Sequence, residues 1–296
     1  MDDLEVAMIK AGVLSEALPY IRRFAGSVFV VKYGGNAIAD AGEAATLESF
    51  ARDVVLMASV GIRPVVVHGG GPQIGEMLAR LAIESRFERG LRVTDAATLE
   101  VVQMVLMGKV NPEIVGAINR FAPLAVGLSG ADTGLIIAEP APGDLGFVGE
   151  VASINPEIVQ RLLGEGMIPV VATVGVDRQG QAYNINADVV AGAIAGAIRA
   201  EKLIYLTNVE GIYANYPDPG SLITRISAEG LAQMLERGSA TAGMIPKLKS
   251  CLDALAAGVG SAHVLDGRME HSLLLEIFTD SGIGTMVVAK EEGGAA

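Results

Sequence analysis

Two lysines and an aspartate occupy short motifs that are far apart in the 296-residue chain. Lys32 follows the apolar run at 28–31, Lys247 ends Gly-Met-Ile-Pro-Lys, and Asp188 ends Asn-Ile-Asn-Ala-Asp. Phosphoryl transfer needs little covalent chemistry from a protein but much positive charge around the reacting group. Two lysines held in place by a carboxylate between them would supply that charge.

Two glycine turns follow strand-like runs and could bind an anion. Without a Cβ, glycine lets a phosphate approach the backbone N–H groups closely, and the second turn also opens a helix whose N-terminus can face an anion. The turns contain Gly34 and Gly35, and His68, Gly69, Gly70 and Gly71. Each turn alone is weak evidence, since tight strand-to-helix connections of this kind are common. Neither has the spacing of a P-loop or of a dinucleotide fingerprint.

Two further motifs carry polar side chains suited to a small anionic substrate. Arg92, between a glycine and a threonine in Gly-Leu-Arg-Val-Thr, could hold a carboxylate bidentately or could be a solvated surface arginine. In an extended segment at 184–188, alternate side chains point the same way, so Asn184, Asn186 and Asp188 would share one face. Capping of the following apolar helix is the alternative for that segment.

Apolar β-branched runs alternate with segments of helical period along the chain. Several runs are apolar throughout, as in strands covered on both faces. The pattern predicts a three-layer α/β/α sandwich around a mainly parallel open sheet. Strands are predicted at 28–31, 64–67, 124–128, 135–138, 168–172, 203–206, 262–265 and 286–289. Helices are predicted at 47–59, 72–82, 96–107, 189–198 and 245–257, and 138–146 is interpreted as a surface hairpin.

The chain is predicted to divide into three parts. Apolar residues at helical spacing over 4–24 predict an extra amphipathic helix within 1–26, which could pack on its own subunit or on another. A polar, glycine-containing turn at 174–183 separates two blocks of strands and helices. The blocks are therefore 27–174 and 175–296.

Composition excludes several classes of protein. With 22 basic and 34 acidic residues the net charge is −12, which argues against nucleic acid or an anionic membrane as a partner. Apolar stretches of membrane-spanning length are interrupted by Gly, Pro or charge, and the acidic start is unlike a signal peptide, so we expect a cytoplasmic protein. The single Cys251 is predicted to be a buried structural thiol, and no metal-ligand spacing occurs, so no protein-built metal site is predicted.

Taken together and in order, the segments 31–37, 67–74, 90–94, 184–188 and 243–247 resemble the amino-acid kinase family, in particular its members that act on N-acetyl-L-glutamate. The resemblance covers almost the whole chain. It implies transfer of the γ-phosphoryl group of MgATP to the side-chain carboxylate of N-acetyl-L-glutamate, a step of arginine biosynthesis. A carboxylate is already a nucleophile at neutral pH, so no general base is needed.

The resemblance also implies a role for each motif. Lys32 and Lys247 would neutralise the transferring group and Asp188 would orient both. The N-terminal block 27–174 would bind the amino acid and 175–296 the nucleotide. Substrate binding is assigned to Gly70, Gly71, Arg92, Asn184 and Asn186, phosphate binding to Gly34, Gly35 and Gly69, and nucleotide binding to Thr207, Asn208 and Gly211. The N–H groups of Gly35 and Gly70 would meet the phosphoryl oxygens. Three positions depart from the family pattern: Ala131 replaces a lysine, Asn208 an aspartate and Ala242 a glycine.

Arginine-inhibited members of the family have a helix before the first strand that interlaces dimers into a hexamer, and the chain resembles them at both ends. The resemblance implies feedback inhibition by arginine and a homo-oligomer, either a dimer or a hexamer. The arginine pocket would contain Tyr20, Lys202, Glu276 and Gly282, although Glu276 by residue type could be a surface carboxylate.

Two other functions fit the motifs. A related kinase could act on another acidic amino acid, including one linked to a carrier protein. A non-catalytic paralogue could bind arginine and assemble without turnover, but it would have no physical need for Lys32, Asp188 and Lys247 at these positions.

Overall fold

The computed structural model describes residues 3–34, 43–88, 90–238, 240, 243–279 and 282–290. Its centre is an eight-stranded sheet. The order is β14 (Arg225–Ser227), β16 (Thr285–Val288), β15 (Ser261–Asp266), β11 (Lys202–Thr207), β1 (Val28–Tyr33), β2 (Arg63–His68), β8 (Ile168–Ala172) and β5 (Ala125–Ser129). All neighbours are parallel except β15 and β16. The predicted mainly parallel sheet is confirmed.

Helices cover both faces of this sheet because its strands are apolar on both sides. In β1, Phe29 and Val31 face one core cluster while Val30 faces the other, as the period of two requires. The first face is covered by α3 (Glu43–Ser59), α4 (Gly71–Arg80), α5 (Ala96–Val105), α6 (Asn111–Asn119) and α11 (Ser272–Ile277). The second is covered by α7 (Glu157–Gly164), α8 (Ala187–Ala197), α9 (Ala228–Glu236) and α10 (Ile245–Ala256). The three-layer arrangement is therefore confirmed.

The strand predicted at 135–138 does not join the large sheet. It forms β6 (Ile136–Pro140), which belongs to a closed four-stranded sheet with β7 (Val148–Ile154), β9 (Val174–Val176) and β10 (Ala182–Ile185). The antiparallel β6 and β7 form the hairpin predicted around 138–146. The segment predicted to separate the blocks is itself the β9–β10 hairpin, and the division into blocks stays a prediction.

A π-helical turn, η1 (Leu106–Val110), joins α5 to α6. The predicted helix end at 107 is therefore wrong, because the π-turn carries the helix on into α6, whose second residue is Pro112. The whole run 96–119 is long and apolar enough to cross a bilayer, but half of its most apolar stretch is buried in the protein. Packing in the core accounts for its apolar composition.

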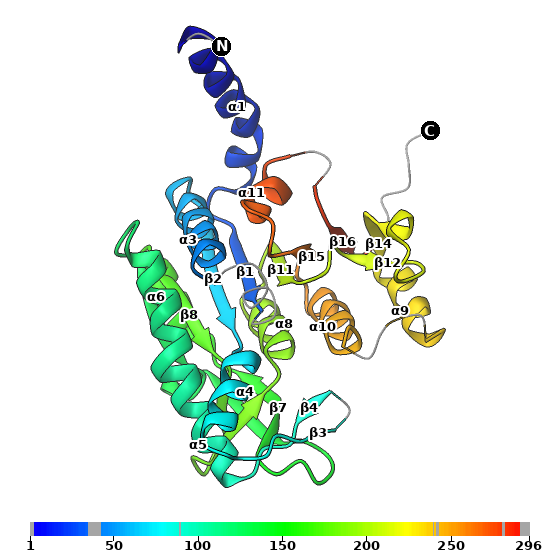
Figure 1. Cartoon of the computed structure of the whole chain (residues 1–296). Helices are drawn as coiled ribbons and strands as arrows, with labels where there is room; N and C mark the ends of the chain where they lie inside the picture. The colour runs from blue at the N-terminus through cyan, green and yellow to red at the C-terminus, as the bar shows by residue number, and fades with distance from the viewer. Residues whose placement is uncertain are drawn as a thin grey trace.

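The N-terminal helix α1 (Asp3–Phe24) extends away from the rest of the chain (Figure 1). Leu4, Met8, Leu14 and Leu18 are exposed along it, so packing of this stretch on its own subunit is wrong. Its last turn is anchored, because Phe24 is buried and packs edge-on against the ring of Phe29.

Two short hairpins complete the fold. One consists of β3 (Phe87–Glu88) and β4 (Leu91–Arg92), and the other of β12 (Ile212–Tyr213) and β13 (Leu222–Ile223). Single turns of 3-10 helix, η2 (Asp132–Gly134) and η3 (Pro219–Ser221), lie in connections. Both hairpins supply residues to the pockets described next.

Candidate active site

A cleft of about 460 Å³ lies where β1, β2 and β11 end at their carboxyl edge. Open parallel sheets bind ligands at this edge. Most of the predicted site residues line this one cleft: Lys32, Gly34, Gly69, Gly70, Gly71, Arg92, Asn184, Asn186, Asp188, Thr207, Asn208 and Lys247. Gly211 lines a neighbouring pocket instead, and Gly35 lies outside the described residues. The fold thus brings together motifs that are more than 200 residues apart in the sequence.

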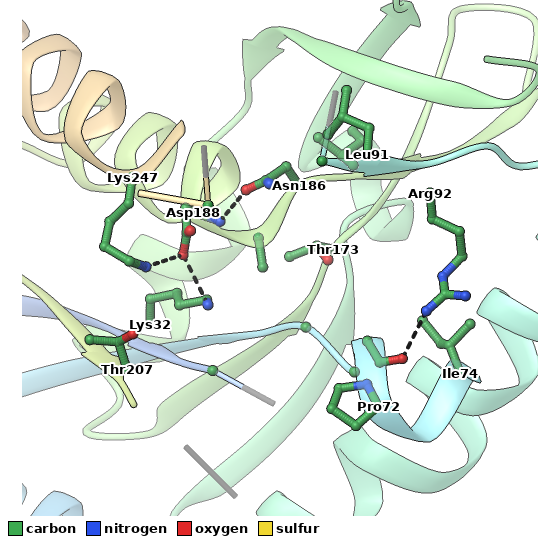
Figure 2. Close-up of a pocket in the computed structure, with 18 of the residues that line it drawn as sticks. Lys32, Pro72, Ile74, Leu91, Arg92, Thr173, Asn186, Asp188, Thr207 and Lys247 are labelled. Atoms are coloured by element: carbon green, nitrogen blue, oxygen red, sulfur yellow. Dashed lines mark hydrogen bonds and ion pairs between the residues drawn. The ribbon is translucent and has the colours of Figure 1, made fainter. Parts of the chain in front are cut away.

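Asp188 lies between the two lysines (Figure 2). Its Oδ1 is 2.9 Å from Nζ of Lys32 and 3.0 Å from Nζ of Lys247. Burial alone would raise the pKa of Asp188, but the two ammonium groups outweigh it and hold this pKa well below its usual range. Burial also lowers the pKa of Lys247, which Asp188 opposes. The three groups form a nearly dry cluster with one net positive charge.

Helix geometry favours Asp188 and disfavours Lys247. Asp188 lies in the first turn of α8, where the helix dipole stabilises a negative charge, whereas Lys247 lies in the first turn of α10, where the dipole opposes a positive one. A lysine at that place therefore depends on its counter-charge. The two helices pack closely because Gly192 of α8 leaves space for Ser250, whose Oγ is 2.2 Å from where a Cβ would lie.

Two residues that were not predicted from the sequence form hydrogen bonds to the backbone of Asp188. The hydroxyl oxygens of Tyr205 and Ser250 lie 3.1 and 2.8 Å from the Asp188 carbonyl oxygen. Nζ of Lys247 lies 4.8 Å from the centre of the Tyr205 ring, within cation–π range. Tyr205 places a hydroxyl group within the apolar run of β11. This hydroxyl was the only feature of the sequence that could have indicated its role.

The glycine turns need glycine for reasons of space. A Cβ on Gly34 would lie 2.8 Å from the Leu206 carbonyl oxygen, and one on Gly70 would lie 2.7 Å from Cδ2 of Leu106. Gly70 is the N-cap of α4, so the free N–H groups of that helix start at the cleft. The second turn therefore presents backbone donors to an anion.

Arg92 is held in place rather than solvated, so the surface alternative is wrong. Its Nη2 donates to the Gly71 carbonyl oxygen at 3.0 Å (Figure 2), and Nη1 bonds the Ser85 hydroxyl. The guanidinium lies over the ring of Phe87, 4.6 Å from its centre. Phe87 is 59% exposed and also lines the cleft, and sequence reasoning missed it.

The segment 184–188 is extended only in part. β10 ends at Ile185, Asn186 caps α8 by accepting from the N–H of Asp188 at 2.8 Å, and the helix begins at Ala187. The prediction of one extended face through 188 is therefore wrong, and capping does occur. Asn184 donates to the Thr94 hydroxyl at 3.2 Å, and all three polar residues still line the cleft.

A second, mostly apolar pocket of about 170 Å³ adjoins the cleft and shares Val209 and Met244 with it. Gly211 and the rings of Tyr213 and Tyr216 line it, and the two ring centres are 5.7 Å apart. The tyrosines were missed because they lie in a polar, loop-like stretch. A mostly apolar pocket lined by two aromatic rings beside a cationic cleft suits a ligand with a planar ring and a phosphate chain.

The residues predicted for an arginine pocket lie elsewhere, at the other end of β11. Nζ of Lys202 is 2.9 Å from Nε2 of His263, and Nδ1 of His263 is 2.6 Å from Oε1 of Glu276. Burial lowers the pKa of Lys202 to about 8 and also lowers that of His263. The side chain of Glu276 is 5% exposed, so the surface alternative is wrong.

Two more of these residues adjoin that cluster. A Cβ on Gly282 would lie 2.7 Å from Oε2 of Glu276. Tyr20 lies in the last turns of α1, and Nζ of Lys202 lies 5.4 Å from the centre of the Phe24 ring at the end of that helix. Tyr20 is half-buried against the core. The cluster thus meets α1 where the helix joins the body.

Other predicted positions have mixed outcomes. Cys251 is buried, as predicted, and burial raises the pKa of its thiol to about 12. Ala131 lines a separate groove with Met104 and Met107. Ala242 lies outside the described residues. Among the side chains that the structure places, no group of three His, Cys, Asp or Glu could hold a metal ion.

Comparison with known proteins agrees with this geometry. The sequence pattern of the amino acid kinase family matches residues 27–266. Acetylglutamate kinase of Pelotomaculum thermopropionicum is 54% identical over 290 residues, covering 94% of this chain and 97% of that protein. N-acetylglutamate synthase from Neisseria gonorrhoeae, solved with coenzyme A and N-acetyl-glutamate, superposes with a TM-score of 0.83 at 29% identity over 96% of this chain. The same synthase solved with L-arginine gives 0.81 at 28% identity over 95% of this chain. This chain spans 64% and 65% of those two synthase chains. The chain belongs to the amino acid kinase family.

Proposed function

We propose that the chain is an acetylglutamate kinase, which transfers the γ-phosphoryl group of MgATP to the side-chain carboxylate of N-acetyl-L-glutamate. The observation that carries the proposal is the buried Asp188 with Lys32 and Lys247 on one of its oxygens. Eight relatives at 51–54% identity over nearly their whole length bear the name acetylglutamate kinase.

The cleft supports each requirement of this reaction. The accepting carboxylate is ionised at neutral pH and needs no base. Lys32 and Lys247 stabilise the negative charge on the transferring group, and the backbone N–H groups of the glycine turns stabilise it further. Preorganised donors of this kind are usually the largest catalytic contribution. Asp188 fixes both ammonium groups before substrate arrives. Phosphoryl transfer therefore proceeds here by positioning and charge alone.

The cleft and the adjoining pocket also offer groups that can bind the α-carboxylate of the amino acid and the adenine of ATP. Arg92 is presented to a carboxylate with its plane already fixed by Phe87, and we assign it and Asn184 to the α-carboxylate of the amino acid. We assign the adjoining apolar pocket of Tyr213 and Tyr216 to the adenine, and Thr207 and Asn208 of the cleft to the rest of the nucleotide. Mg²⁺ enters with the ATP.

The test is release of ADP from MgATP with N-acetyl-L-glutamate, glutamate and aminoadipate assayed in parallel. Turnover with N-acetyl-L-glutamate and a much lower rate with the other two is the expected result. A free amino group carries a positive charge that the N-acetyl group lacks, so glutamate should bind poorly. No turnover with any of the three substrates would overturn the proposal.

We further propose that arginine inhibits the enzyme by binding at the Lys202–His263–Glu276 cluster, and that the enzyme is a cytoplasmic homo-oligomer. Glu276 offers a buried carboxylate to a guanidinium, and a buried charge pair of this kind is selective for arginine. The exposed apolar residues of α1 would be covered in the oligomer. Because α1 ends at this cluster, arginine bound there could affect the packing of α1 in the oligomer, and assembly could affect arginine binding.

Glu276→Gln should raise the arginine concentration needed for half-inhibition about tenfold or more. The amide oxygen can still accept from Nδ1 of His263, but the amide nitrogen cannot accept from the Ile283 N–H as Oε2 of Glu276 does, and the amide has no charge for the guanidinium. A charge-assisted hydrogen bond is about twice as strong as a neutral one. Inhibition curves are measured relative to each variant's own uninhibited rate. Glu229→Gln on α9, an exposed carboxylate, is the control. Equal inhibition of the Glu276 variant and the wild type would exclude this site.

A further inference from the structure

A buried histidine and asparagine lie directly beneath the second glycine turn and have no part in the reaction as proposed. His68 is fully buried and Asn111 is 4% exposed. Nδ2 of Asn111 is 2.9 Å from the Val170 carbonyl oxygen and 3.0 Å from Nε2 of His68. Nδ1 of His68 is 3.0 Å from the Gly69 carbonyl oxygen. Buried polar groups are costly unless each has its partner.

These contacts determine which ring nitrogen carries the proton. A carbonyl oxygen only accepts, so the Asn111 atom that faces Val170 is the amide nitrogen, and its second N–H points at Nε2 of His68. Nε2 must then accept, and the proton of the neutral ring is on Nδ1, which donates to Gly69. Burial lowers the pKa of His68 to about 4, so the ring stays neutral at neutral pH.

The hydrogen bond to Gly69 sets the direction of the next amide group. In a planar trans peptide the carbonyl of one residue and the N–H of the next point in opposite directions. Holding the Gly69 carbonyl against the imidazole therefore turns the Gly70 N–H to the other side of the turn. Gly69 and Gly70 both line the cleft, so this donor is available to an anion there.

The π-helical turn explains how Asn111 reaches this position. A π-turn inserts one extra residue and is often found at functional sites. Leu106 and Val110 of this turn touch Gly70, where a Cβ would lie 2.7 and 3.2 Å from their side chains. Asn111 follows at once, and a Cβ on Gly127 would lie 2.0 Å from its Oδ1, so only glycine leaves it space. One irregular turn thus supports Gly70 and supplies the partner of His68.

We propose that His68 and Asn111 are positioning residues that aim the Gly70 amide N–H at the transferred phosphoryl group. The inference rests on the proposed function, because it assigns a task to that cleft. Neither side chain lines the cleft, so the pair acts through the peptide between Gly69 and Gly70.

Two substitutions at His68 separate its two hydrogen bonds. In His68→Asn the amide nitrogen can take the place of Nδ1 and donate to Gly69, while the bond from Asn111 is lost. In His68→Gln the side-chain oxygen can take the place of Nε2 and accept from Asn111, while the donor to Gly69 is lost. We expect His68→Asn to be less thermostable but to keep kcat within about threefold, and His68→Gln to be more stable than His68→Asn but to lose kcat about 10-fold to 100-fold. KM for both substrates should change little in either variant.

A purely structural role gives a different result. In that case kcat would fall most in the less stable variant, and this order would overturn the inference. The tautomer is measured without any substitution, by nitrogen NMR of the wild-type chain, whose histidines number three. A proton on Nδ1 of His68 is expected. A proton on Nε2 in a chain that turns over N-acetyl-L-glutamate would overturn this inference alone, whereas the Nδ1 tautomer without turnover would overturn the proposed function.

Discussion

Asp188→Asn is expected to lower kcat about 100-fold or more, although the substitution removes no group that touches the substrates. Both ammonium groups would remain, but without the carboxylate they would repel each other at a site where Lys247 is 5% exposed. Fixed donors that lose their alignment give up most of their effect on a developing charge. Single-turnover and steady-state rates with MgATP and N-acetyl-L-glutamate check the expectation.

The pH dependence of this variant should be distinctive. The pKa of Lys247 already lies below its usual value because of burial, and Asp188 opposes that shift. Removing Asp188 lowers this pKa further, so the charged lysine persists only at lower pH. Residual kcat should therefore fall as pH rises through the new pKa. The free energy of unfolding should move the opposite way, rising with pH as the uncompensated buried charge is lost.

Asp253→Asn is the matched control for this substitution. Asp253 is an exposed carboxylate on α10. Its replacement by asparagine likewise exchanges a carboxylate for an amide. The control should keep its rate and its pH profile. Asp188→Asn with wild-type kcat would contradict the assigned mechanism, because it would show that the lysines need no counter-charge to hold them.

The charged cluster was predictable because its residues are tied to strand and helix ends. Lys32 lies in β1, a strand whose apolar residues are covered on both faces, and Asp188 lies in the first turn of a strongly apolar helix. In a parallel sheet such ends meet at one edge whatever the loops between them do. Local sequence pattern was sufficient to indicate the cluster, and the family resemblance added the roles.

The supporting residues were not predictable because their role depends on contacts between distant segments. Ser250 reaches Asp188 only because Gly192 brings α8 and α10 close together, and Asn111 reaches His68 only because a π-turn shifts the helix. Phe87 lies against the Arg92 guanidinium because the two residues are cross-strand partners in the short β3–β4 hairpin. The period of hydrophobic residues predicts where a helix or strand lies. It does not predict the extra residue of a π-turn or how closely two helices approach each other.

Lys247→Met is expected to lower kcat about 100-fold to 1000-fold, by removing one of the two charges that face the transferring group. The effect on stability should be unlike that of Asp188→Asn. Methionine is apolar and of similar length, and Asp188 keeps Lys32 as a partner at 2.9 Å. Lys247→Met therefore leaves one buried carboxylate paired with one ammonium group, whereas Asp188→Asn leaves two buried ammonium groups without a counter-charge, and breaking a buried ion pair in this way costs about 3 to 5 kcal/mol.

The double variant decides whether the lysine and the aspartate act as one unit. Because Asp188 acts by holding the lysines, Lys247→Met combined with Asp188→Asn should lose much less than the product of the two single losses, as residues of one catalytic unit do. It should also regain stability relative to Asp188→Asn, since a single buried ammonium group remains. Lys249→Met, an exposed lysine two positions along α10, is the control. Fully multiplicative losses would show that Asp188 serves the reaction independently of Lys247.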